Sequence, residues 1–74
     1  MPQFLIVHCA RQRTVLIGGV DQGTTDELIE LPASGIYTVT LQLDTDDICT
    51  PALHRVNLVN TNALRPLEVT FVLG

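Results

Sequence analysis

The sequence predicts an all-β fold: a small antiparallel β-sandwich, or an open barrel, of six to seven short strands. Apolar and polar residues alternate with a period of two in several short segments, which is typical of half-buried strands. Gly, Pro, Asn and Asp separate these segments at intervals of about ten residues. Helical periodicity is almost absent, since only the stretch Thr24–Glu27 resembles a helix cap.

The first segments are apolar at consecutive positions. Gln3–Cys9 and Thr14–Ile17 both have this character, which predicts strands buried on both faces. The pair Gly18-Gly19 follows and marks a strand end, because glycine permits a bulge or a close backbone approach. No lysine follows this pair and no helix begins there, so it does not match a phosphate-binding loop.

The clearest strand signal lies in Ile36–Leu43. Its alternation predicts that Tyr37, Val39, Leu41 and Leu43 face the core. The preceding Leu31–Gly35 is predicted to be a tight turn, because proline presets φ and glycine accepts a left-handed conformation. Glu27–Leu31 and Ile36–Leu43 are therefore predicted to be the two arms of one hairpin.

The second half of the chain alternates as well. His54–Val59 is one such segment, and Leu67–Leu73 is another, in which Val72 is an apolar residue on the polar face. Pro51 cannot donate to a strand ladder, so Ile48–Leu53 is predicted to be an edge, a bulge or a strand change. With no internal repeat and no linker, residues 1–74 are predicted to form a single β-sandwich domain.

Composition favours a surface that is covered by another protein. The chain is 46% apolar and 16% charged, has a mean hydropathy of +0.32, and contains no lysine. A chain of this size buries only about 60% of the surface that its unfolded form exposes. The apolar surplus therefore predicts a homo-oligomer, or docking on a larger protein.

Neither a nucleic-acid partner nor a membrane partner is predicted. The net charge is −4 and the four arginines are spread along the chain, so Arg11 and Arg13 are predicted to be a solubilising rim. The run FLIV is too short for a signal peptide, and no segment reaches the length of a membrane span. A cytoplasmic location is predicted, unless the chain is excised from a longer exported protein.

Catalysis and metal binding find little support in the sequence. His8 and Cys9 could form an activated thiol, but neighbouring residues of a strand point to opposite faces. Together with Cys49 and His54 they are the right types for zinc, yet the spacing of a closed site is missing. No catalytic residue, metal or cofactor is predicted. Two free thiols are expected in a reducing compartment, with a Cys9–Cys49 disulfide left open.

An acidic loop gives an alternative function. Asp44, Asp46 and Asp47 could ligate calcium, although the loop lacks the glycine and the distant glutamate of an EF-hand. Aspartates also cap turns by accepting backbone N–H groups, and that is the interpretation we favour for this loop and for Asp21–Asp26. A small ligand-binding module, for calcium or a carbohydrate, is the alternative.

The order of segments resembles a known type of module. The stretches "VLIGGVDQGTT", "LPASGIYTVTLQLD", "CTPALHRVNLVN" and "LEVTFVL" are similar to the strands and turns of small PEGA-like and carboxypeptidase-regulatory-like β-sandwich modules. The first strand, Phe4–Cys9, is more apolar than in those modules. The resemblance implies a non-catalytic accessory domain and transfers no functional residue.

The predicted function is a non-enzymatic protein-interaction or structural module that self-associates through apolar strand surface. Strand addition at an exposed edge is one route to such a contact. The predicted interface residues are Phe4, Ile6 and His8 on one face of the first strand, together with Val72.

Overall fold

Nine strands and no helix make up residues 2–73, the part of the chain that the computed structural model describes. Seven strands have four or more residues: β1 (Gln3–His8), β2 (Thr14–Ile17), β3 (Val20–Thr24), β4 (Leu28–Leu31), β5 (Gly35–Leu41), β7 (His54–Leu58) and β8 (Leu67–Thr70). The other two, β6 (Cys49–Thr50) and β9 (Val72–Leu73), have two residues each. The all-β class is confirmed, and the longer strands match the predicted number.

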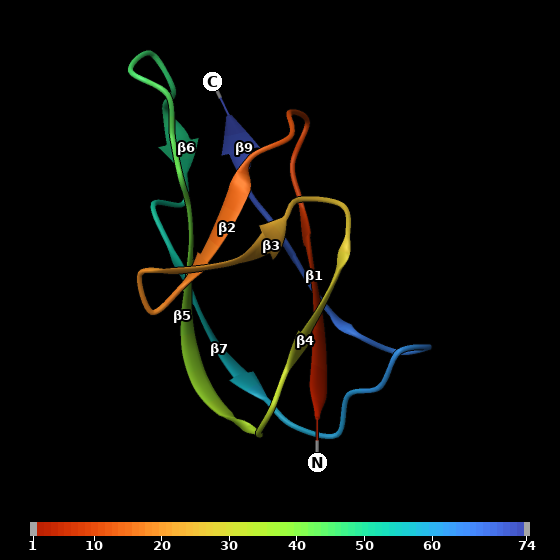
Figure 1. The fold of residues 1–74 in the computed structure, drawn as a ribbon. Helices are drawn as coiled ribbons and strands as arrows, with labels where there is room; N and C mark the ends of the chain where they lie inside the picture. The colour runs from red at the N-terminus through yellow and green to blue at the C-terminus, as the bar shows by residue number, and fades with distance from the viewer. Residues whose placement is uncertain (1, 74) are drawn as a thin grey trace.

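The strands form two main sheets and a small one. The order is β4-β1-β8 in the first sheet, β3-β2-β5-β7 in the second, and β6-β9 in the third. Neighbouring strands are antiparallel in every pair but one, since β8 runs parallel to β1. The small sheet lies at one end of the molecule, beyond the ends of β2 and β1 (Figure 1).

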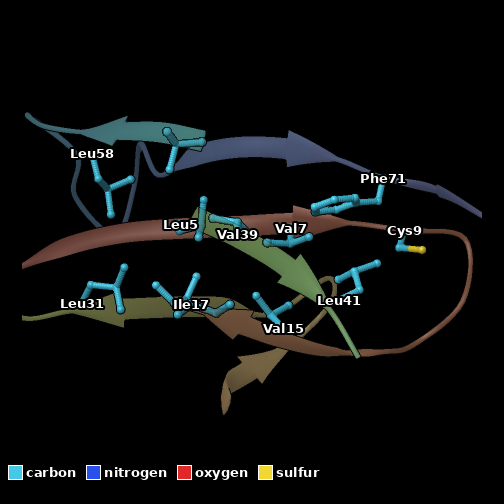
Figure 2. Close-up of a cluster of buried hydrophobic side chains, with 12 residues drawn as sticks. Leu5, Val7, Cys9, Val15, Ile17, Leu31, Val39, Leu41, Leu58 and Phe71 are labelled. Atoms are coloured by element: carbon cyan, nitrogen blue, oxygen red, sulfur yellow. The ribbon is translucent and has the colours of Figure 1, made fainter. Parts of the chain in front are cut away.

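The core lies between the two main sheets, where side chains from both layers meet (Figure 2). It is built from alternate residues of the strands and of the positions directly after them: Leu5, Val7, Cys9, Val15, Ile17, Ile29, Leu31, Val39, Leu41, Val56, Leu58 and Phe71. Fully burying one of the larger of these side chains stabilises the fold by about 1.5–3 kcal/mol. Alternation therefore predicts correctly the buried face of β5, β7 and β8. The predicted burial of β1 and β2 on both faces is wrong, because only alternate residues of these strands are buried and the others are half-buried.

The predicted hairpin of Glu27–Leu31 and Ile36–Leu43 is wrong. β4 pairs with β1, whereas β5 pairs with β2 and β7, so the two arms belong to different sheets. The intervening turn carries the chain from one layer to the other, and the Tyr37 hydroxyl donates a 2.6 Å hydrogen bond to the Ala33 carbonyl across it. The period of two fixes which face of a strand is buried, but both layers of a sandwich satisfy it equally.

The inward face of β5 ends earlier than predicted. Val39 and Leu41 are buried as expected, but β5 stops at Leu41 and the Leu43 side chain is 41% exposed. The prediction for Leu43 is therefore wrong, because residues beyond the last ladder pair no longer follow the alternation of the sheet.

Turn residues behave as their chemistry requires. Gly18 and Gly19 form a two-residue hairpin turn between the paired residues Ile17 and Val20, with φ of 59° and 84°. Two consecutive positive φ angles match the turn that fits the twist of a hairpin, and glycine adopts them at no steric cost. β6 ends immediately before Pro51, which confirms that Ile48–Leu53 is not one central strand.

Two buried polar side chains tie loops to strands. The Gln3 Oε1 atom accepts hydrogen bonds from the Thr61 backbone N–H and from the Thr61 hydroxyl, at 3.0 and 2.7 Å. The Thr61 hydroxyl oxygen in turn accepts from the Phe4 N–H at 2.8 Å. Thr25 plays the same part elsewhere, since its hydroxyl accepts from the Arg13 N–H and donates to the Arg11 carbonyl. Within residues 2–73, no buried side-chain nitrogen or oxygen lacks a partner.

Candidate functional site

The outward face of the β4-β1-β8 sheet brings most of the predicted interface residues together. On β1 the half-buried Phe4, Ile6 and His8 alternate with residues that point into the core. Ile6 lies directly opposite Leu28 of β4 and Glu68 of β8, so these side chains share the outward face. β1 is the central strand of this sheet, so its outward side chains form the middle of the face.

The same outward parity continues from β8 into β9. Glu68, Thr70 and Val72 are exposed and alternate with residues that face inward. Val72 pairs with Thr50 of β6, and Ile48 immediately precedes β6. Val72 and Ile48 are 61% and 68% exposed. We call Phe4, Ile6, His8, Leu28, Ile48 and Val72 the outer apolar face.

The sheet edges are less suited than this face to contact with another chain. The four edge strands are β4 and β8 in one main sheet, and β3 and β7 in the other. Each of them carries a charged residue with an exposed position: Glu30, Glu68, Asp21 and Arg55, respectively. The β2–β3 ladder also contains an irregularity between Val15 and Leu16. Charges and bulges at edges hinder the addition of another strand, so the architecture favours contact through a face.

His8 sits between two carboxylates at one end of β1. Its Nδ1 atom lies 3.2 Å from Asp26 Oδ1, and its Nε2 atom lies 2.9 Å from Glu68 Oε1. These two hydrogen bonds, first that with Glu68 and then that with Asp26, raise the pKa of His8 above 6.5. The sequence suggested His8 as an interface residue but gave no sign of its partners, which are 18 and 60 residues away.

The acidic loop is organised around one arginine. Asp47 accepts hydrogen bonds from Arg13 Nε at 2.8 Å and from Arg13 Nη2 at 3.1 Å. The Asp47 Oδ2 atom also accepts from the Asp44 backbone N–H at 2.8 Å. The Asp47 side chain is only 4% exposed and that of Arg13 16%. Arg13 is therefore a structural partner of this loop, and its assignment to a solubilising rim is wrong.

The electrostatics of this loop follow from that contact. The hydrogen bonds from Arg13, and then that from Asp44, lower the pKa of Asp47 to about 2. Asp44 and Asp46 remain exposed beside an open depression that Arg11 and Leu43 also line. Both carboxylate oxygens of Asp47 are already used inside the fold, which supports the turn interpretation. Calcium binding by Asp44, Asp46 and Asp47 stays a prediction.

Replacing Asp47 with asparagine is expected to lower the melting temperature at neutral pH and to flatten its fall in acid. The folded pKa of about 2 lies below the ordinary value of 3.8. The stabilisation is therefore present above pH 3.8 and is lost as the pH falls through about 2. Circular dichroism melts across this range measure the effect. Asp46, an exposed neighbour of Asp47, provides the control. An equal flattening of the acid-induced fall in melting temperature in Asp46→Asn would contradict this account.

The two cysteines are free thiols. Cys9 is buried in the core, whereas His8 points outward, which confirms that the adjacent pair lies on opposite faces. Burial raises the pKa of Cys49, and its thiol donates to the Pro51 carbonyl at 3.3 Å. A raised pKa disfavours the nucleophilic thiolate.

Residues 2–73 contain no cluster of three His, Cys, Asp or Glu side chains arranged to hold a metal ion. His54, the other zinc candidate, packs edge-on against Phe71 with ring centroids 4.7 Å apart. Its Nε2 atom lies 2.7 Å from the Thr70 carbonyl oxygen. In the same residues, no helix is long and apolar enough to span a membrane.

Comparisons of the chain with protein-family models, with curated proteins and with solved structures found no match. The resemblance to PEGA-like modules therefore stays a prediction.

Proposed function

We propose that this chain is a non-enzymatic interaction module that self-associates by packing its outer apolar face against the same face of a second copy. The observation that supports this most is the gathering of apolar side chains on one side of the molecule. Half-buried Phe4 and Ile6 lie beside Leu28, which is 47% exposed, and Ile48 and Val72, 68% and 61% exposed, lie further along, beyond His8 and Thr70. Exposed apolar surface of this kind marks contact sites in soluble proteins.

A second copy of the chain suits this face for two reasons. The face is apolar at its centre and charged at its rim, where Glu30 and Glu68 lie beside Phe4 and Ile6. Such an arrangement, with an apolar core and a polar rim, is typical of protein interfaces. A two-fold axis across β1 at Ile6 would make each Ile6 contact its symmetry mate and set Phe4 opposite the partner's His8. A self-complementary contact of this kind closes the assembly at a dimer.

The test is a double substitution at exposed positions of the face. Leu28→Gln with Val72→Gln removes apolar area without opening the core, because both side chains are at least 47% exposed. We expect the dimer to weaken at least about tenfold, which corresponds to 1.4 kcal/mol. Sedimentation velocity over a range of concentrations gives the dissociation constant.

A matched control uses the opposite surface of the molecule. Ile36 is 66% exposed and points outward from the four-stranded sheet, so Ile36→Gln removes a similar apolar side chain elsewhere. Its dissociation constant should match that of the unsubstituted chain. Equal weakening by both variants, or no weakening by the double variant, would show that the contact lies elsewhere.

A further inference from the structure

Both ring nitrogens of His8 face carboxylate oxygens, and this geometry favours the protonated ring. A neutral imidazole has one donor nitrogen and one acceptor nitrogen, whereas an ionised carboxylate only accepts. Contacts of 3.2 Å to Asp26 and 2.9 Å to Glu68 are therefore both hydrogen bonds only when the ring is protonated. A neutral ring can donate only one of these two hydrogen bonds.

These contacts join three elements across the width of the sheet. His8 ends β1, Asp26 lies in the turn between β3 and β4, and Glu68 lies on the edge strand β8. The turn is also held directly, because the Asp26 N–H donates to the Val7 carbonyl at 2.7 Å. The protonated ring therefore links the turn to the one strand of this sheet that pairs in parallel.

His8 is also the only basic side chain on β1, β4, β8 and the turn. The charged groups around it are all carboxylates: Asp26 and Glu27 in the turn, Glu30 on β4 and Glu68 on β8. The Glu27 carboxylate accepts a 2.6 Å hydrogen bond from the Thr24 hydroxyl. His54 of β7 contacts the Thr70 carbonyl oxygen rather than a carboxylate. The arginines Arg11 and Arg13 contact Asp47 instead.

We propose that protonation of His8 controls self-association, so that the dimer is favoured when the ring is charged and weakened when it is neutral. The inference rests on the proposed function, because His8 lies on the outer apolar face. The charged ring offsets carboxylates that would otherwise face those of the second copy. Loss of its proton leaves an additional uncompensated negative charge on each face, and two such faces repel one another.

The direction of the pH dependence follows from the raised pKa of His8. A group whose pKa is higher in the folded state contributes stability that is present below its ordinary value of 6.5 and is lost as the pH rises through the folded value. The fold should therefore lose stability as the pH rises from 6.5 through the folded pKa of His8. The dimer should weaken over the same range, because the neutral ring no longer offsets the carboxylates that face the second copy.

The first measurement is the dissociation constant by sedimentation velocity, below pH 6.5 and again well above the pKa of His8. We expect it to rise about tenfold with pH in the unsubstituted chain, within the usual range of coupling between sites. His8→Gln should remove this dependence, whereas His54→Gln, the control at the second histidine, should retain it. A dimer with the same dissociation constant at both pH values would overturn the inference and leave the proposed function intact.

The second measurement does not require a dimer. NMR titration of the ring protons in the Leu28→Gln, Val72→Gln variant, at concentrations below its dissociation constant, gives the pKa of His8 in the monomer. The same variant with Asp26→Asn and Glu68→Gln added is the comparison. We expect a value above 6.5 that falls when both carboxylates are neutralised. A value at or below 6.5 would overturn the inference. If no dimer forms at either pH, both the proposed function and its regulation by protonation of His8 are wrong.

Discussion

Phe71→Ala is expected to cause the largest loss of stability of any substitution considered. The Phe71 side chain is 1% exposed, and it lies in the core between the two main sheets, beside Val7 (Figure 2). Truncating a buried phenylalanine costs about 3–5 kcal/mol, because apolar contacts are lost and a cavity remains. The free energy of unfolding of a small domain is only about 5–15 kcal/mol, and the thin core of this chain places it near the lower end of that range. We expect a chain that is partly unfolded at room temperature.

Urea denaturation followed by circular dichroism measures this loss. Leu64 is 92% exposed, so Leu64→Ala is the control and should change the free energy of unfolding by less than about 0.5 kcal/mol. If Phe71→Ala is too unstable to give a folded baseline, Phe71→Leu should lose less free energy of unfolding, and that loss can still be measured. A midpoint for Phe71→Ala equal to that of Leu64→Ala would mean that Phe71 is not a core residue.

Gln3→Met is expected to give the second-largest loss among these variants, about 1–3 kcal/mol. Gln3 is 6% exposed and accepts both hydrogen bonds of Thr61, which holds the connection between β7 and β8 against the start of β1. A methionine of similar length fills the space but leaves the Thr61 N–H without its acceptor, and an unsatisfied buried donor carries this cost.

The matched control for that substitution is Gln42→Met, at an exposed position just after β5. Urea denaturation should show no loss there beyond about 0.5 kcal/mol. Hydrogen exchange adds a local readout, since Gln3→Met should speed exchange of the Thr61 amide before that of the core strands. Slow exchange at Thr61 in the variant would contradict the role assigned to Gln3.

Sequence patterns predict the buried faces of this fold well. The alternation in β5, in β7 and along Leu67–Leu73 identifies Val39, Val56 and Phe71 as inward residues, and each is buried. These patterns work because the side-chain period of a strand depends only on its own backbone. They also place Phe4, Ile6 and His8 on one face of β1 before any pairing is known.

Strand partners are not predictable in the same way. Short connections usually join paired strands, which favours a β4–β5 hairpin. In the structure β4 pairs with β1 instead, and β1 has β4 and β8 as its two neighbours. The parallel pairing of β8 with β1 joins residues about 60 positions apart, which no local pattern reveals. The sequence therefore predicts which face of a strand is buried better than it predicts the layer of that strand or its partners.

The polar contacts that shape the candidate site are equally remote in sequence. Arg13 and Asp47 are 34 residues apart, and His8 and Glu68 are 60 apart. An aspartate in a turn is expected to bond to its own backbone, and Asp47 does so with the Asp44 N–H. The arginine on its other side depends on how β2 and the acidic loop meet in the folded chain.

Self-association through the outer apolar face is tested most directly by light scattering coupled to size exclusion. The reduced, unsubstituted chain should be measured over a wide range of concentrations at a pH below 6.5, where His8 is protonated. We predict a mass that rises with concentration from that of the 8.1 kDa monomer to a plateau at twice that mass. A monomer at every concentration would contradict the proposed function.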